Sequence, residues 1–223
     1  MFLVVCGGFR LRKIMTKQNL LLIGAGGHTR SCIDVIEQTQ QFSIIGLVGL
    51  AHEVGHSVLG YPVIGDENEL PQLRAQCDVA LVTLGQIKTA ALRQKIFMQL
   101  QDLSFPLPTI ISPHAYVSKH AVIGVGTIIM HGAIVNAGAR IGNNCIINSH
   151  ALIEHDVMVA DHCHISTAAV LNGGVSVGSG TFIGSNTAIR QGVTIGNHCV
   201  IGMGQCVLSD YRDNAFVPAL LRD

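Results

Sequence analysis

The sequence predicts an α/β unit over residues 18–106, followed by a left-handed parallel β-helix over residues 107–210. Three observations predict this fold class. Strand-like and helix-like segments alternate in the first unit, an aliphatic residue stands at every sixth position from 111 to 207, and Pro106 and Pro108 separate the two patterns. Strands that alternate with helices form parallel sheets with right-handed crossovers, whereas a fixed short period indicates a repeat architecture.

The first unit contains three apolar runs, at residues 19–24, 42–49 and 78–85, which we expect to be buried strands. The segment 31–40 follows the first run and has a helix-like sequence, and the segment 88–100 follows the third and has the apolar spacing of an amphipathic helix. This order predicts a small parallel sheet of Rossmann-like type with helices packed against it.

The repeat predicts the second unit. The seventeen positions in steps of six from Ile111 to Val207 are all Ile, Val or Leu, and the position two before each is nearly always small. A period of six fits a short strand followed by a corner, with two inward residues per repeat filling a narrow solenoid. Cys145, Cys163 and Cys199 occupy the small inward position, so we expect core thiols there rather than ligands or nucleophiles.

Composition excludes several function classes. The 223 residues include 14 basic and 14 acidic side chains, which argues against nucleic acid or an anionic membrane as the main partner. With 48% hydrophobic and 13% charged residues the chain is not disordered, and no apolar stretch is long enough to insert into a membrane as a span. The seven cysteines form no CxxC pair, so without an export signal we expect reduced thiols and a cytoplasmic protein.

The two ends of the chain fall outside both predicted domains. We expect residues 1–17 to be an N-terminal extension and residues 211–223 to be a C-terminal tail. The apolar start is followed by three basic residues, which is the reverse of a signal peptide. Met15 directly precedes the first strand, and we therefore interpret residues 1–14 as an upstream extension that arises from the choice of start codon.

A glycine-rich turn, Gly24 to Thr29, lies between the first strand and the first helix, where such turns bind phosphate. Thr29 replaces the third glycine of the dinucleotide pattern, and Gly49 and Leu50 stand where an acid would follow the second strand. A nicotinamide cofactor is therefore not expected. The turn favours a nucleotide or nucleotide-sugar phosphate, and a tight turn without a ligand remains the alternative.

The segment from His52 to His56 spells HExxH, the pattern of zinc proteases. That chemistry needs a helix that places both histidines on one face. Gly49 precedes the segment and Gly55 interrupts it, so we expect a loop and no zinc site.

His155 is the candidate general base of the repeat region. By their register, His131, His155 and His164 point out of the coil, where a histidine is usually a solvated surface residue. Asp156 follows His155, and a carboxylate beside an imidazole orients the ring and favours its protonated form. That is the arrangement that general-base catalysis requires.

Five motifs together resemble one family: GAGGH at 24–28, LGYPVIGD at 59–66, IEHD at 153–156, His164, and VPA at 217–219. They resemble the bacterial sugar acetyltransferases of the hexapeptide-repeat superfamily. These include UDP-4-amino-sugar N-acetyltransferases of bacillosamine-type surface-glycan and glycoprotein pathways and the related sialic-acid O-acetyltransferases.

The resemblance implies a homotrimer that uses acetyl-CoA as co-substrate, with active sites between adjacent β-helices, a nucleotide sugar as substrate and no metal. His155 matches the catalytic base, and Asp156 matches the acid that makes it more basic. The positions that match the acetyl-CoA groove are His164, Ser185, Gly202 and Met203. The positions that match the nucleotide-sugar site are Gly26, Gly27, His28 and Gly85. The family often has acids where Gly49 and Leu50 stand, in a position to bind uridine.

In the expected reaction, the 4-amino group of a UDP-linked amino-dideoxy sugar attacks the thioester carbonyl of acetyl-CoA while His155 accepts its proton, without a covalent acyl-enzyme. Three alternatives stay open. A hydroxyl acceptor such as sialic acid can use the same base. The separation of His114, His150 and His155 resembles the zinc ligands of γ-type carbonic anhydrases. A trimeric scaffold that binds sugar nucleotides without catalysis is the third.

Overall fold

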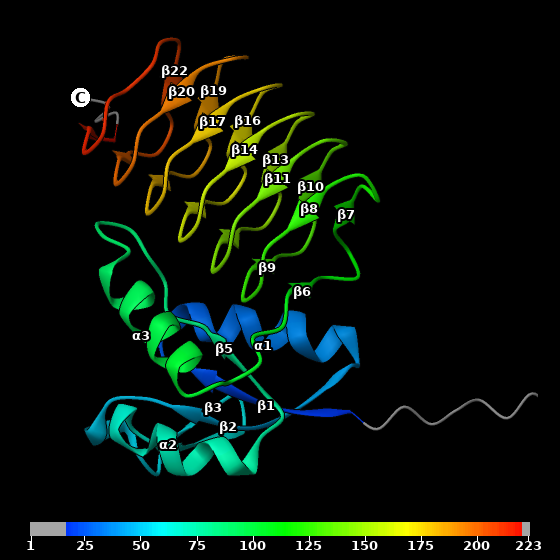
Figure 1. Cartoon of the computed structure of the whole chain (residues 1–223), viewed down its shortest axis with the longest axis vertical. Helices are drawn as coiled ribbons and strands as arrows, with labels where there is room; N and C mark the ends of the chain where they lie inside the picture. The colour runs from blue at the N-terminus through cyan, green and yellow to red at the C-terminus, as the bar shows by residue number, and fades with distance from the viewer. Residues whose placement is uncertain (1–16, 220–223) are drawn as a thin grey trace, which may run out of the picture.

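The computed structural model describes residues 17–219. It contains an α/β domain followed by a solenoid of parallel strands, as the sequence predicts (Figure 1). The interpretation of residues 1–14 as an upstream extension falls on residues outside the described part.

The sheet of the α/β domain has the strand order β3-β4-β2-β1-β5. The strands β1, β2, β4 and β5 run parallel, and β3 pairs antiparallel with β4. The strand bounds are β1 Gln18–Ile23, β2 Phe42–Val48, β3 Ser57–Val58, β4 Tyr61–Gly65 and β5 Val79–Val82. The three strands expected from apolar runs are confirmed, and the short β3 and β4 are additional.

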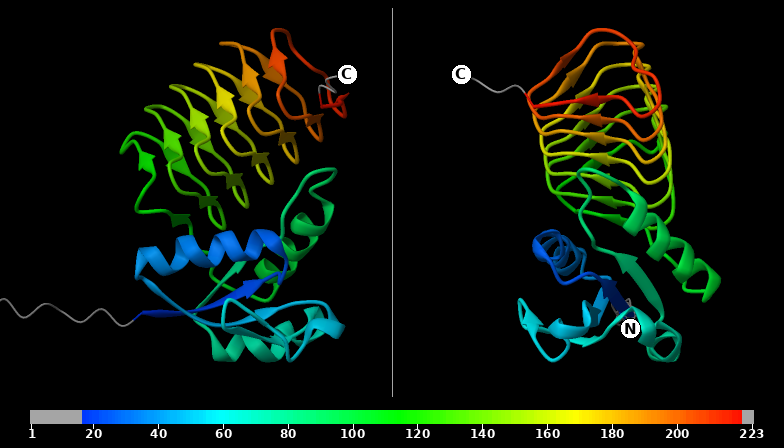
Figure 2. Two further views of the ribbon diagram at one scale, coloured as in Figure 1. Left: turned by 180° about the vertical axis from the view of Figure 1, so that it is seen from behind. Right: turned by 90° about the vertical axis from the view of Figure 1, so that its left-hand side faces the viewer.

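Three α-helices cover the two faces of this sheet: α1 Gly27–Thr39, α2 Leu70–Leu73 and α3 Ala91–Asp102. Three 3₁₀ turns, Ala51–Glu53, Glu67–Glu69 and Arg74–Gln76, complete the domain. Helix α1 packs on one face together with the first strands of the solenoid, whereas α2 and α3 pack on the other. Figure 2 shows α1 lying directly beneath the coils, so this helix is enclosed between the sheet and the solenoid.

The solenoid has three faces, each a parallel sheet. The domain face lies against α1 and contains β6 Ile110–Ile111, β9 Ile128–Ile129, β12 Ile146–Ile147, β15 His164–Ile165, β18 Phe182–Ile183, β21 Val200–Ile201 and β23 Phe216–Val217. The open face contains β7 Tyr116–Val117, β10 Ile134–Val135, β13 Leu152–Ile153, β16 Val170–Leu171, β19 Ala188–Ile189 and β22 Cys206–Val207. The groove face contains β8 Val122–Ile123, β11 Arg140–Ile141, β14 Met158–Val159, β17 Ser176–Val177 and β20 Thr194–Ile195.

The interior of the solenoid follows the six-residue period. From Ile129 onward every aliphatic repeat residue is buried, and Cys145, Cys163 and Cys199 are fully buried between them, which confirms their role as core thiols. Ile111 is more exposed because it lies in the first coil, where no further coil stacks on it. Strand β23 pairs with β21, so the solenoid continues beyond residue 210 into the segment expected as a tail.

Polar contacts join the two domains. Arg93 of α3 is buried and donates from Nη2 to the carbonyl oxygen and the side-chain oxygen of Asn144, both at 2.8 Å. On the other side, the Nε2–H of His131 donates to Asp34 Oδ2 of α1 at 3.0 Å. Because these two directional contacts lie on different sides of the boundary, they hold the two domains at a defined angle as well as together.

The HExxH segment forms no helix of the zinc-protease kind. Residues Ala51–Glu53 make one 3₁₀ turn, and Gly55, two residues after it, has a φ of 87°. The expected loop is confirmed. Within residues 17–219, no helix has the length and apolar character needed to cross a bilayer.

Candidate functional site

His155 lies at the corner between the open face and the groove face. Its Nδ1–H donates to Asp156 Oδ2 at 3.0 Å, which leaves the lone pair of Nε2 free to accept a proton. Asp156 has a φ of 60°, and its carboxylate reaches this position because Gly138 of the preceding coil has no side chain in its path. The imidazole lies over Gly173 of the next coil, where a Cβ would come within 2.5 Å of Nε2. Glycines on both neighbouring coils therefore make room for the pair.

The His155 ring is open to solvent, with 59% of its side chain exposed. An exposed imidazole with one nitrogen held by a carboxylate and the other free is arranged for proton transfer to or from a bound molecule. Below it, Glu154 accepts from Asn136 Nδ2 at 3.0 Å, so the corner is also braced across coils.

His164 lies on a different face. Its side chain points out of the coil, as its register predicts, but the α/β domain covers it. Its Nδ1–H donates to the Gln86 carbonyl at 2.7 Å, and its Nε2 accepts from Asn148 Nδ2 at 3.1 Å. These partners fix a neutral tautomer. Burial lowers the pKa of His164 to about 4, with the nearby Arg93 charge adding to the effect.

The other residues expected around the coenzyme lie at the corner between the domain face and the open face. Ser185 and Met203 follow β18 and β21 at equivalent places in successive coils, and the Ser185 hydroxyl is 2.9 Å from that of Ser166. Met203 is 57% exposed, and Gly202 precedes it. The full width of the open face of the solenoid separates this corner from the corner that carries His155. A single chain thus does not bring the expected base and the expected coenzyme residues together.

The expected nucleotide-sugar residues surround the amino end of α1. Gly26 is the N-cap, and a Cβ at Gly26 or Gly27 would meet no atom within 4 Å, so the backbone is open to an approaching group. His28 lies beside Gly85, and its Nε2 is buried without a hydrogen-bond partner among the described residues. Burial lowers the pKa of His28 to about 3, with smaller effects of His164 and Arg93.

A pocket of about 300 Å³ opens next to this turn, at the carboxyl ends of β1 and β2. Its walls are largely apolar, and two acids, Glu53 and Glu67, line it. Open parallel sheets bind their ligands at this edge. In the sequence, Glu53 belongs to the HExxH segment, and we did not expect it at this edge of the sheet. The sequence feature that could have predicted this place is the position of Glu53, five residues after the end of β2. That short distance lets it reach the edge of the sheet, where Gly49 and Leu50 stand in place of an acid.

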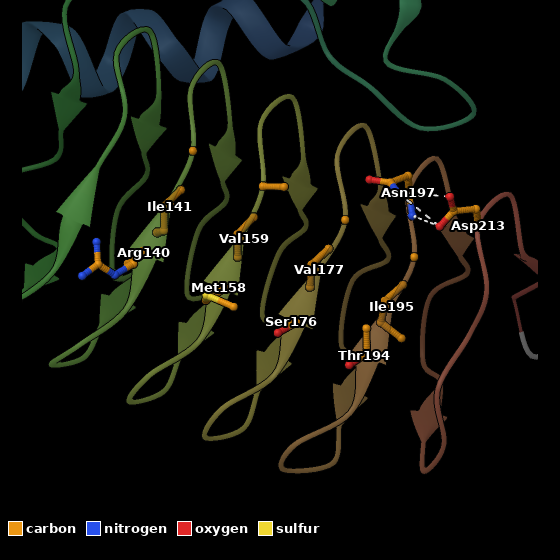
Figure 3. Close-up of a pocket in the computed structure, with 14 residues that line it drawn as sticks. Arg140, Ile141, Met158, Val159, Ser176, Val177, Thr194, Ile195, Asn197 and Asp213 are labelled. Atoms are coloured by element: carbon orange, nitrogen blue, oxygen red, sulfur yellow. Dashed lines mark hydrogen bonds between the residues drawn. The ribbon is translucent and has the colours of Figure 1, made fainter.

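A second hollow of about 560 Å³ runs along the groove face (Figure 3). Met158, Ser176 and Thr194 project along it from consecutive strands, and Asn197 and Asp213 lie at its far end. It is shallow and contains none of the expected catalytic or coenzyme residues.

The three histidines of the carbonic-anhydrase alternative do not meet within one chain. His114 and His150 lie at the corner before the open face, whereas His155 lies at the corner after it. Among residues 17–219, no three His, Cys, Asp or Glu side chains are grouped so as to hold a metal ion.

Comparisons with known proteins agree with this architecture. A family model described as the PglD N-terminal domain matches residues 19–100, and one described as bacterial transferase hexapeptide (six repeats) matches residues 174–204. A comparison with curated proteins gave no match.

Three solved structures share the arrangement of both domains. Perosamine N-acetyltransferase from Caulobacter crescentus, in complex with CoA and GDP-perosamine, is 34% identical, with a TM-score of 0.85 over 90% of this chain and 93% of that one. The acetyltransferase domain of PglB from Neisseria gonorrhoeae, in complex with acetyl coenzyme A, is 30% identical, with a TM-score of 0.83 over 91% and 97%. WeeI from Acinetobacter baumannii is 19% identical, with a TM-score of 0.77 over 90% and 93%, and shares the fold.

Proposed function

The chain belongs to the sugar N-acetyltransferases of the hexapeptide-repeat superfamily, and on that premise we propose that it transfers the acetyl group of acetyl-CoA to the 4-amino group of a nucleotide-linked amino-dideoxy sugar. The solved relatives that bind CoA, acetyl-CoA and GDP-perosamine support both substrates. The observation that carries the proposal is the exposed His155–Asp156 pair, with Nδ1 held at 3.0 Å and Nε2 free.

In the proposed reaction the sugar nitrogen attacks the thioester carbonyl carbon. A C–N bond forms, and His155 Nε2 accepts the proton that the nitrogen must lose. The C–S bond then breaks, and the proton passes from His155 to the CoA thiolate that leaves. Asp156 holds the Nδ1–H and stabilises the positive charge on the ring between the two transfers. The repeat cysteines Cys145, Cys163 and Cys199 are enclosed in the core, so the proposed reaction uses none of them as a nucleophile.

We place the reaction between two copies of the chain. His155 lies at one corner of the prism, and Ser185 and Met203 lie at another, so the base of one copy would complete the coenzyme site of its neighbour. The open face between these corners carries an outward ladder that is apolar from end to end: Tyr116, Ile134, Leu152, Val170, Ala188 and Cys206. Tyr116 is 59% and Ile134 is 40% exposed in one chain. Leu152, Val170 and Ala188 are partly exposed. An outward apolar face of this kind marks an association surface, which supports a homotrimer.

The nucleotide sugar is assigned to the α/β domain. The diphosphate would bind the free N–H groups at the amino end of α1, where Gly26 and Gly27 leave the backbone open. The nucleoside would occupy the neighbouring pocket of about 300 Å³.

Thiol release from acetyl-CoA tests the proposal directly. Purified protein is offered a UDP-linked and a GDP-linked 4-amino-4,6-dideoxy sugar, with free and CMP-linked sialic acid as hydroxyl acceptors. We expect turnover with an amino sugar and none with sialic acid. Turnover with sialic acid alone would instead make the protein an O-acetyltransferase, and stoichiometric zinc in an inactive protein would revive the carbonic-anhydrase alternative.

A further inference from the structure

Glu53 occupies the place that an acid at the end of β2 would take. Its Oε2 accepts the N–H of Leu50 at 2.7 Å, and a Cβ built on Gly49 would lie 2.7 Å from the same oxygen. The carboxylate therefore comes back over Gly49, close to the glycine turn that follows β1, and it needs glycine at position 49 to do so. The 3₁₀ turn Ala51–Glu53 therefore supplies a carboxylate at the end of β2, where the sequence itself has no acid at positions 49 and 50.

We propose that Glu53 recognises the base of the sugar nucleotide and that this base is guanine. The inference rests on the proposed function for the presence of a sugar nucleotide. The choice of base rests on the chemistry of the pocket.

The pocket around Glu53 suits a flat, uncharged ring. Its other walls are largely aliphatic, including Leu84 and Ile96 on the side of α3. Glu67 at the rim is paired with Lys95 at 2.7 Å, whereas no Lys or Arg in the described chain pairs with Glu53. An unpaired carboxylate repels phosphate, so the diphosphate belongs at the α1 end and the nucleoside in the pocket.

A carboxylate only accepts hydrogen bonds. The Watson–Crick edge of guanine offers two adjacent donors, N1–H and N2–H, which match the two oxygens of Glu53. Uracil offers one donor between two carbonyl oxygens, and these oxygens would face the carboxylate with like partial charge. Within the described residues, Leu50 N–H is the single protein donor to Glu53, so lone pairs on both oxygens remain for the base.

The variant Glu53→Gln tests this contact without removing the turn. The amide oxygen can still accept from Leu50 N–H, while the amide nitrogen turns an acceptor into a donor inside the pocket. Against guanine this places donor against donor. Against uracil it offers one donor and one acceptor, which uracil can satisfy.

The matched control is Glu69→Gln. Glu69 Oε2 accepts the N–H of Asp66 at 3.0 Å and comes back over Gly65, in the same capping arrangement as Glu53 over Gly49. Glu69 does not line the nucleoside pocket. A loss due only to a weakened turn would thus appear in both variants.

The measurement is titration calorimetry of GDP and UDP, without CoA, on the wild type and both variants, with thermal unfolding as the check on folding. We expect the wild type to bind GDP about tenfold more tightly than UDP, the discrimination typical of a two-point base contact. Glu53→Gln should weaken GDP about tenfold while UDP changes less than twofold or binds more tightly. Glu69→Gln should change neither affinity.

Equal or tighter binding of UDP by the wild type would overturn the inference. An equal loss of GDP and UDP affinity in Glu53→Gln would also overturn it, since Glu53 would then contact the ribose that both share. Because calorimetry requires no acetyl transfer, the two proposals fail separately. Glu53-dependent GDP binding without acetylation of any amino sugar would reject the enzyme activity alone, whereas efficient acetylation of a UDP-linked sugar alone would reject the guanine assignment alone.

Discussion

Arg93 and Asn144 join the α/β domain to the solenoid by a forked contact, in which one Arg93 nitrogen donates to two oxygens of Asn144 at 2.8 Å. Both residues are buried, and Asn144 holds a φ of 51° at a coil corner. Asn144 also donates to the Arg93 carbonyl at 3.3 Å and contacts His162 Nδ1 at 2.9 Å. The pair therefore connects α3 to two neighbouring coils.

We expect Arg93→Lys to lower the free energy of unfolding by about 2 kcal/mol, because an ammonium on a shorter stem cannot reproduce a buried, charge-assisted contact to two oxygens. Urea unfolding measures the loss. Arg30→Lys, at an exposed arginine on α1 of the same domain, is the comparison and should change the stability by less than about 0.5 kcal/mol. Equal effects of the two substitutions would show that Arg93 has no special part in joining the domains.

The second prediction concerns the catalytic pair. His155→Ala should reduce kcat by about 10²–10⁴ with little change in the KM for acetyl-CoA, since proton transfer is lost and binding is not. Asp156→Asn should reduce kcat less, because the ring stays but loses the carboxylate that orients it. Steady-state kinetics on folded protein of unchanged oligomeric state gives both numbers. Full activity of His155→Ala would remove this residue from the mechanism.

The third prediction concerns the stability of the fold at low pH. The pKa of His164 is lowered to about 4 and that of His28 to about 3, both below the ordinary value of 6.5, so the unfolded chain binds more protons than the folded one below about pH 6.5. Stability is then complete above that pH and is lost as the pH falls towards 4, by at most about 1.4 kcal/mol per pH unit for each group. Urea unfolding at pH 7 and 5 measures the slope. His164→Gln should reduce it, whereas His52→Gln, at an exposed histidine, should leave it unchanged.

The fourth prediction tests the open face as the subunit contact. In the proposed trimer, Ile134→Glu should give folded monomers and abolish acetyl transfer, because a charge cannot be buried at a subunit contact without a partner. The matched control is Val122→Glu, a residue on the groove face that is 55% exposed. Sedimentation velocity with circular dichroism separates loss of assembly from loss of fold. A trimer that survives Ile134→Glu would place the interface elsewhere.

The fifth prediction concerns the core. Ile153 is fully buried between coils, and Ile153→Asp should prevent folding because the solenoid is too narrow to hydrate a carboxylate. Soluble expression and circular dichroism are the readouts. Met158→Asp, five residues further and exposed, should fold, and an equally unstructured Met158→Asp would show general sensitivity rather than a core effect.

The six-residue period alone determined the solenoid, because each repeat fills its interior with the same two residue types and stacks on the repeat before it. The same period also determines the corner of the coil at which each outward residue lies. Ser185 and Met203 differ by one coil of 18 residues, whereas His155 stands 30 residues before Ser185, so their different corners followed from the numbering. The buried strands β1, β2 and β5 were predictable for a related reason, since each is a local run of apolar residues.

Only the tertiary structure decided what the outward residues contact. His164 points out of its coil as its register requires, yet it is buried because the chain around Gln86 packs over it. In the sequence, Glu53 is part of an HExxH pattern that suggests zinc chemistry. In the structure, the 3₁₀ turn places its carboxylate over Gly49 instead. The repeat period determines whether a side chain points into or out of the coil, because this direction depends only on the local sequence. The residue that an outward side chain contacts lies on a distant segment of the chain, and only the packing of the two domains brings the two together.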